Sequence, residues 1–170
     1  MKSPVGDREQ QILAETPFAP FGELKFSLTY SPKEGHLSVR IIKADNLMKG
    51  SELRECNSFV KVILVTNQVA KQHTHIVKAT KTPVFDKRLL FRGVTVPDLS
   101  IANLKMKVYT KTSSTISLNS KRTLLGEVTL PLADFSLSFG NEIKMWRKLQ
   151  DRSMVGSLPA FIRIPAFYLW

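Results

Sequence analysis

The sequence predicts an all-β domain, an eight-stranded antiparallel β-sandwich. Short segments in which apolar and polar residues alternate recur along the chain, and each predicts a strand with one buried and one solvent-facing side. Turn-forming residues separate these segments, and no stretch has the long period of an amphipathic helix. A hydrophobic fraction of 43% over 170 residues is enough to fill a core. Together these observations favour a sandwich over a helical or α/β fold.

The first two predicted strands form a hairpin. Apolar and polar residues alternate over residues 23–30 and again over 37–41. The intervening segment 31–35 reads Ser-Pro-Lys-Glu-Gly, which is typical of a turn. Residues 45–56 are then expected to form a long polar loop.

The next two strands are predicted at residues 58–65 and near 71–77, joined through a turn at 66–68. Pro83 excludes a helix and starts a further extended segment that ends in the apolar residues 89–91. This part of the chain brings five basic residues close together on neighbouring strands. They are Lys61, Lys71, His73, His75 and Lys78.

Three further strands complete the predicted sandwich, around residues 104–108, 125–130 and 145–149. Between them, 93–100 is expected to be irregular, 110–123 to be a second long polar loop, and 134–141 to be a loop or short helical turn.

The charge balance points to an anionic partner. The formal net charge is +11 and the isoelectric point is about 10.0, which favours nucleic acid, an anionic membrane or an acidic protein. No nucleic-acid-binding motif is present, so we predict no nucleic-acid partner. The single cysteine, Cys56, forms no internal disulfide and indicates a reducing compartment. With no signal peptide and no transmembrane segment in the sequence, we expect a cytoplasmic protein, peripheral on membranes.

Five motifs in order resemble the C2-domain family, and most closely its synaptotagmin-like branch. They are Gly22–Tyr30, Leu37–Leu47, Asn57–Val62, Lys78–Asp86 and Leu125–Leu132. Trp146 and Leu149 fit the closing strand of that family. The resemblance covers about residues 21–150 and implies a C2-like sandwich with synaptotagmin-type topology. It leaves residues 1–20 as an N-terminal linker and 151–170 as an apolar C-terminal tail.

Many C2 domains hold calcium with aspartates on two loops at one end of the sandwich. Calcium prefers roughly six to eight oxygen ligands, several of them anionic. The matching positions in this chain are all neutral: Ser51, Asn57, Thr110, Thr112 and Thr123. The same loops instead carry Lys49, Arg54, Lys111, Lys121 and Arg122. Because these cations repel calcium, we predict no metal site.

The resemblance also implies a role for the basic residues of the third and fourth strands. In this family, lysines on that face often bind phosphoinositide headgroups or acidic proteins, and Lys61 and Lys71 match such positions. Ordinary solvated lysines on an exposed face are the alternative. The cationic loops could add constitutive, salt-sensitive contact with anionic lipid, although a polar loop without a binding role is slightly favoured.

Catalytic and metal-binding alternatives are weaker. His73 and His75 lack a third ligand for zinc and are expected to be surface residues. Cys56 is expected to be a free loop thiol, because no His/Asp partners can be assigned to it. We therefore predict no enzyme activity and no cofactor.

The expected function is a calcium-independent C2 module that serves vesicle trafficking or exocytosis as an adaptor. Its expected partners are anionic phospholipids, either phosphoinositides or phosphatidylserine, and acidic proteins, other C2 proteins included. The alternative is a protein-interaction module without significant lipid binding. For the tail, an interfacial anchor, a strap on the sandwich and the unstructured end of a truncated chain compete, and the last is favoured.

Overall fold

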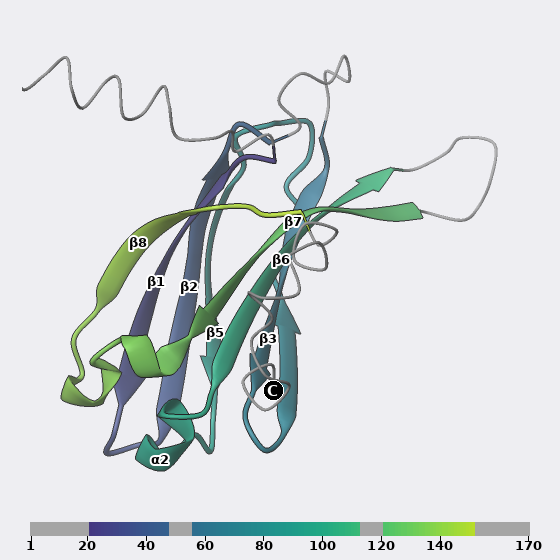
Figure 1. Cartoon of the computed structure of the whole chain (residues 1–170). Coiled ribbons are helices and arrows are strands. Elements are labelled where there is room, and N and C mark those ends of the chain that lie inside the picture. The colour runs from purple at the N-terminus through teal and green to yellow at the C-terminus, as the bar shows by residue number, and fades with distance from the viewer. Residues whose placement is uncertain (1–20, 48–55, 113–120, 152–170) are drawn as a thin grey trace, which may run out of the picture.

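The computed structural model describes residues 21–47, 56–112 and 121–151. In these residues, eight strands form two four-stranded antiparallel sheets that pack face to face (Figure 1). The strand order is β5-β2-β1-β8 in the first sheet and β4-β3-β6-β7 in the second. The predicted eight-stranded antiparallel sandwich is confirmed. The predicted linker 1–20 and all of the predicted tail except Asp151 lie outside the described residues.

The strands of the first sheet are β1 (Glu23–Ser31), β2 (His36–Asp45), β5 (Val84–Phe91) and β8 (Ile143–Lys148). Those of the second sheet are β3 (Ser58–Val65), β4 (Val69–His73), β6 (Asn103–Thr112) and β7 (Lys121–Pro131). The short helix α2 (Val96–Leu99) and the 3-10 turns η1 (Leu132–Asp134) and η2 (Leu137–Phe139) lie at one end of the sandwich (Figure 1). No helix in the described ranges is long and apolar enough to cross a membrane.

The alternating sequence decides which side of each strand faces the core. In β1, Leu24, Phe26 and Leu28 are fully buried, while Lys25 between them is only half-buried. In β3, Val60 and Val62 face the opposite sheet. Their neighbours along β3 point to the other side, because successive side chains in a strand alternate between the two faces. The inner faces of both sheets thus form one apolar core.

A buried hydrogen bond ties β1 to the loop before α2. The hydroxyl of Tyr30, whose side chain is buried, donates to the carbonyl of Val94 at 2.7 Å. Burial raises the pKa of the Tyr30 hydroxyl, and the charge of Asp98 adds to that increase. The neutral, hydrogen-bonded hydroxyl therefore fixes β1 to the end of the sandwich where α2 lies.

The structure corrects the predicted extent of three strands. The fourth strand ends at His73 rather than near residue 77. The Thr74 amide still donates to the Val60 carbonyl at 2.9 Å, but the return hydrogen bond is made by the Thr74 side chain. The amide of Val60 donates to the Thr74 hydroxyl at 3.0 Å, in place of a backbone carbonyl. The chain leaves β3 there and returns only at Val77, which exchanges two backbone hydrogen bonds with Ser58. Residues 74–76 therefore form a bulge.

The second predicted polar loop, 110–123, is also shorter than expected. β6 runs on to Thr112 and β7 begins at Lys121, with Thr110 paired to Thr123 and Lys111 paired to Arg122. Polar composition favoured a loop, but cross-strand pairing extends both strands to their polar ends. The residues expected at a loop tip, Lys111, Lys121 and Arg122, lie within strands. Residues 93–100, expected to be irregular, contain α2.

Candidate anion-binding site

The outer face of the second sheet carries rows of lysines. Lys61 in β3 lies opposite His73 in β4 and Lys107 in β6. One row further along, Ile63 lies opposite Lys71 and Lys105. Cross-strand partners are direct neighbours, and residues two apart share a face. This outer face, called the β3 face below, therefore gathers four lysines over three strands.

One acidic residue reduces the charge of the β3 face. Glu127 in β7 lies opposite Lys107, and their charged groups are 3.9 Å apart. Both side chains are mostly buried, with exposed fractions of 12% and 17%. Lys107 is thus engaged with a carboxylate, and the attraction of the face for an external anion rests on the other cations.

An aromatic stack adjoins the lysines on the β3 face. The rings of Phe59 and Tyr109 stack with centroids 5.4 Å apart and planes 15° apart. The rings of His73 and Phe59 lie edge to face, with their centroids 6.4 Å apart. The guanidinium of Arg122 lies 5.8 Å from the centroid of the Tyr109 ring. That distance is within the range of cation–π attraction. The stack therefore holds two cationic or titratable side chains beside an apolar wall.

A hollow of about 390 Å³ opens beside this stack. Its volume falls in the range of small-ligand sites, roughly 300–1,000 Å³. The lining residues are Phe59, His73, Thr74, His75, Ile76, Lys111 and Arg122. The 74–76 bulge forms one wall, and the paired ends of β6 and β7 supply the two permanent cations. The hollow combines positive charge, hydrogen-bond donors and an aromatic wall, which suits an anionic group attached to a larger body.

The structure brings together only part of the predicted basic group. Lys61 is half-buried in the middle of the β3 face, and Lys71 is exposed on β4. His73 ends β4, whereas His75 lies in the bulge rather than on the strand, and both line the hollow. Lys78 is exposed beyond the bridge at residue 77 and is not a lining residue. The placement of His75 and Lys78 on a strand was therefore wrong.

The predicted loop cations also separate into different places. Lys111 and Arg122 line the hollow, and Lys121 is exposed at the start of β7. Lys49 and Arg54 lie outside the described residues. Two histidines of the predicted strand group and two cations of the predicted loop group thus line one hollow.

Several residues of the site were not predicted from the sequence, among them Thr74 and Ile76 in the bulge. Lys105 and Lys107 alternate with buried residues of β6, so their outward direction was readable. Their position beside β3 was not readable, because β3 and β6 are paired across a long sequence separation. Phe59 and Tyr109 form their stack only through the same pairing.

Two of the positions that match calcium-binding aspartates serve internal contacts. The Asn57 side chain accepts a hydrogen bond from the Ala79 amide at 2.9 Å and donates to the Lys111 carbonyl at 3.4 Å. Thr110 is buried. Thr123 is exposed on β7, Thr112 ends β6, and Ser51 lies outside the described residues. Within 21–47, 56–112 and 121–151, no three His, Cys, Asp or Glu residues cluster so that they could hold a metal ion.

Cys56 is a free thiol in the segment before β3, as expected, but it is also a core residue. Its side chain is fully buried, and its Sγ donates to the hydroxyl of Thr110 at 3.7 Å. Burial raises the pKa of the thiol, while that hydrogen bond and the charge of Lys81 partly oppose the increase. A buried thiol with a raised pKa is poorly nucleophilic, so Cys56 has a packing role.

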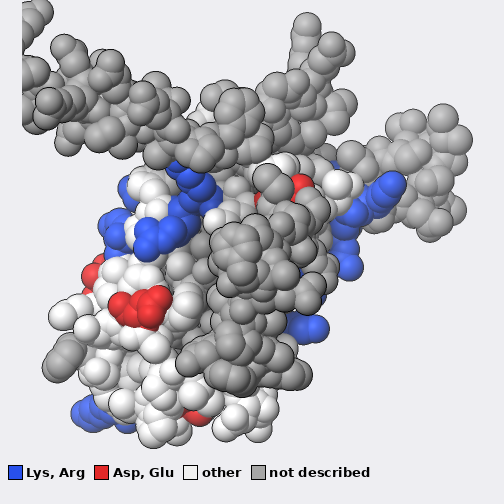
Figure 2. All heavy atoms as spheres, viewed as in Figure 1, with Lys and Arg blue, Asp and Glu red and all other residues white. Residues whose placement is uncertain are grey.

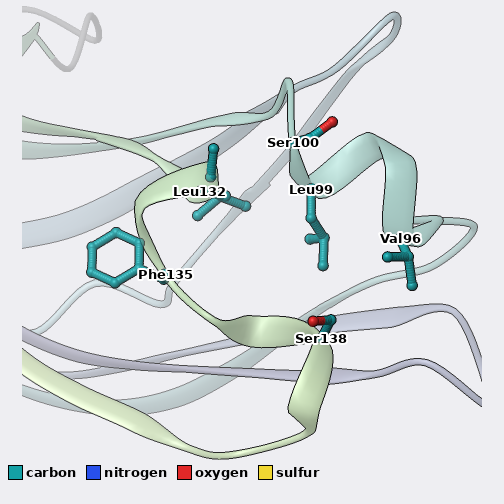
Figure 3. A pocket seen from close by; sticks show the side chains of 7 residues that line it. Val96, Leu99, Ser100, Leu132, Phe135 and Ser138 are labelled. Atoms are coloured by element: carbon teal, nitrogen blue, oxygen red, sulfur yellow. The ribbon is translucent and has the colours of Figure 1, made fainter.

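A second hollow, of about 190 Å³, lies at the opposite end of the sandwich between α2 and the 3-10 turns (Figure 3). Leu99 from α2 and Leu132 from η1 point toward it, and Ser138 from η2 faces them (Figure 3). Its lining holds no charged side chain. The anion-binding candidate is therefore the hollow on the β3 face.

Residues 35–149 match the family model of the C2 domain. This match spans more than half of the sequence, and the chain belongs to the C2 domain family. Synaptotagmin-1 from Aplysia californica is 31% identical over 130 residues, which are 76% of this chain and 28% of that protein. The C2 calcium-dependent domain-containing protein 4C from Mus musculus is 30% identical over 112 residues, or 65% of this chain and 26% of that protein. The chain spans less than a third of the length of these relatives.

Solved structures give the same fold. The third C2 domain of KIAA1228 protein superposes with a TM-score of 0.66 at 26% identity, over 81% of this chain and 94% of that domain. A C2 domain of RIM from Drosophila superposes with a TM-score of 0.65 at 23% identity, over 76% of this chain and 98% of that domain. Both place the described residues in the C2 sandwich.

Proposed function

We propose that residues 21–150 form a C2 module that binds anionic phospholipid through the β3 face without calcium. The observation that carries this proposal is the meeting of Lys111 and Arg122 with His73 and His75 at one hollow, beside the lysines of β3 and β4. C2 domains of the synaptotagmin and RIM type bind phospholipids and proteins in general, and C2 domains are generally non-enzymatic binding modules.

The number of cations sets the expected strength. Each basic residue held near an anionic surface contributes about 1 kcal/mol. Lys61, Lys71, Lys111 and Arg122 together would contribute about 4 kcal/mol, which is close to a thousandfold in partitioning. The hollow favours a clustered charge such as a phosphoinositide headgroup over the single charge of phosphatidylserine, because two permanent cations converge on it.

Independence from calcium follows from the chemistry of the loop ends. A calcium-binding C2 domain needs several anionic oxygens near the ion. Asn57 and Thr110 supply neutral groups that are engaged in internal contacts. The adjacent cations, Lys111 and Arg122, already attract an anion and oppose a divalent cation. We therefore propose constitutive, salt-sensitive docking.

The proposed cellular role is that of an adaptor in vesicle trafficking or exocytosis, cytoplasmic and peripheral on membranes. Synaptotagmins among the relatives support this role. The proposed lipid site would hold the module on the membrane, which leaves other parts of the surface open to protein partners.

The test is co-sedimentation with phosphatidylcholine vesicles that contain phosphatidylinositol bisphosphate. The variant Lys61→Ala/Lys71→Ala should bind about 30-fold more weakly than wild type, because it loses two cations of about 1 kcal/mol each. The matched control Lys33→Ala/Arg92→Ala loses the same net charge from exposed positions outside the β3 face, and it should bind as wild type does. Equal binding by the first variant and wild type would reject this site.

A further inference from the structure

An exposed tryptophan lies on the outer face of the other sheet, between lysines. The Trp146 side chain on β8 is 37% exposed. The ammonium groups of Lys43 and Lys25 lie 5.3 and 5.5 Å from the centroid of its ring. Lys25 on β1 is the cross-strand partner of both Trp146 and Lys43. Three adjacent strands therefore present one row of two lysines and an aromatic ring.

Lysines continue in the rows on either side. Lys148 lies opposite Glu23, and Lys144 lies opposite Ser27. Both are exposed, and Figure 2 shows Lys and Arg side chains gathered over the β8 side of the molecule. We call this surface the Trp146 face; its residues are Lys25, Lys43, Lys144, Trp146 and Lys148.

Carboxylates interrupt the positive charge of this side of the sandwich. Asp45 lies 3.8 Å from Lys43, and Glu23 faces Asp45 across β1 and β2. Further along, Arg40 donates two hydrogen bonds to Asp86, at 2.8 and 2.6 Å. Positive and negative side chains are therefore mixed on this side of the sandwich, with more positive than negative ones. On the β3 face, by contrast, Glu127 is the one acidic residue named among the cations of the described residues.

We propose that the Trp146 face is a docking surface for an acidic protein segment that carries an apolar side chain among its carboxylates. The apolar side chain packs on the exposed part of the Trp146 ring. The four lysines around the ring bind the carboxylates. Lys25 and Lys43 are already held beside the ring by cation–π attraction, so less side-chain freedom is lost when a partner binds.

The carboxylates favour a protein over a membrane as the occupant. A membrane presents anionic headgroups over the whole face, so Glu23, Asp45 and Asp86 would oppose it. A folded or extended protein can place a neutral or basic group opposite each carboxylate. Tryptophan is also among the residues enriched at the centres of protein interfaces, where a few side chains supply most of the binding energy.

The position of this face allows two partners at once. The β3 face and the Trp146 face lie on the outer sides of opposite sheets, so a partner on one leaves the other open (Figure 1). The docking proposal does not depend on lipid binding by the β3 face. Its test is made in solution without lipid, so the failure of either proposal can be recognised separately.

The probe is a fluorescein-labelled poly-glutamate peptide with one central leucine, measured by fluorescence anisotropy on the full chain. Charge reversal by Lys25→Glu/Lys43→Glu should weaken binding by more than about tenfold. Lys33→Glu/Arg92→Glu makes the same change of net charge at exposed positions outside both faces and should leave binding within about twofold. Trp146→Ala should weaken binding of the leucine peptide more than binding of a peptide with serine in its place, because only the leucine packs on the ring. Urea unfolding of each variant checks that it is folded.

Three results would overturn the proposal. Equal losses in the two charge-reversal variants would mean that net charge alone drives binding. Undiminished binding by the Lys25→Glu/Lys43→Glu variant would place the peptide elsewhere. A loss of vesicle binding in that variant, with peptide binding intact, would assign the face to lipid.

Discussion

Replacing Lys111 and Arg122 with alanine should reduce binding to vesicles that contain phosphatidylinositol bisphosphate by about 30-fold. Both side chains line the hollow on the β3 face, and each is a permanent cation. At about 1 kcal/mol for each cation near an anionic surface, the pair contributes about 2 kcal/mol. Because every 1.4 kcal/mol of binding free energy changes the affinity about tenfold, a loss of about 2 kcal/mol weakens binding about 30-fold.

The assay is vesicle co-sedimentation over a range of lipid concentrations at low and high salt. The Debye length falls from about 10 Å at 0.1 M salt to about 3 Å at 1 M, so the difference between wild type and variant should shrink as salt rises. The control is again Lys33→Ala/Arg92→Ala, which lowers the net charge equally and leaves the hollow intact.

Two outcomes would refute the reasoning. Wild-type affinity in the Lys111→Ala/Arg122→Ala variant would show that the hollow does not receive the lipid headgroup. An equal loss in the control would show that the total charge of the chain, rather than its arrangement at the hollow, governs binding.

Three further predictions concern the scaffold. Tyr30→Phe leaves the buried Val94 carbonyl without its donor, so the free energy of unfolding in urea should fall by about 1–2 kcal/mol; an unchanged value would contradict this role. Because burial raises the pKa of the Cys56 thiol, the unfolded chain ionises first, and stability relative to a Cys56→Ala variant should fall as pH rises above about 8.5. Iodoacetamide at pH 8 should modify this thiol only after unfolding, and rapid native modification would show that it is accessible. Gly126→Ala would bring a Cβ within 2.8 Å of the Leu149 Cβ. Thermal unfolding should therefore show that the free energy of unfolding falls by about 1–3 kcal/mol. Wild-type stability would mean that the neighbouring residues shift to make room for the methyl group.

Local pattern was sufficient to predict most of the sandwich. The alternation in β1 and β2 identified the buried and exposed sides, and the run at Ser58–Val65 matched β3 from end to end. These features depend on the side-chain period of two in a strand, which is visible in any short window of sequence.

Features decided by tertiary pairing could not be predicted in this way. The end of β4 depends on the Thr74 hydroxyl, which bonds to a residue 14 positions earlier. The polar ends of β6 and β7 become strands because Lys111 and Arg122 pair with each other. That pairing turned two supposed loop cations into lining residues of the hollow.

The candidate site was predictable in composition but not in arrangement. Lys61 and Lys71 were identified correctly as neighbours on β3 and β4, one row apart. The addition of Lys105 and Lys107 required the pairing of β3 with β6, which no local signal reveals. Cys56 is a free thiol outside the strands, as predicted, but its burial could not be predicted because its contact with Thr110 spans 54 positions of the sequence.

The most direct test of a calcium-independent lipid site compares wild-type binding to phosphatidylinositol bisphosphate vesicles in calcium and in a calcium chelator. The paired ends of β6 and β7 already carry Lys111 and Arg122, so the apparent affinity should be the same in both solutions and should fall with added salt. Binding that requires calcium, or that the chelator abolishes, would contradict the account.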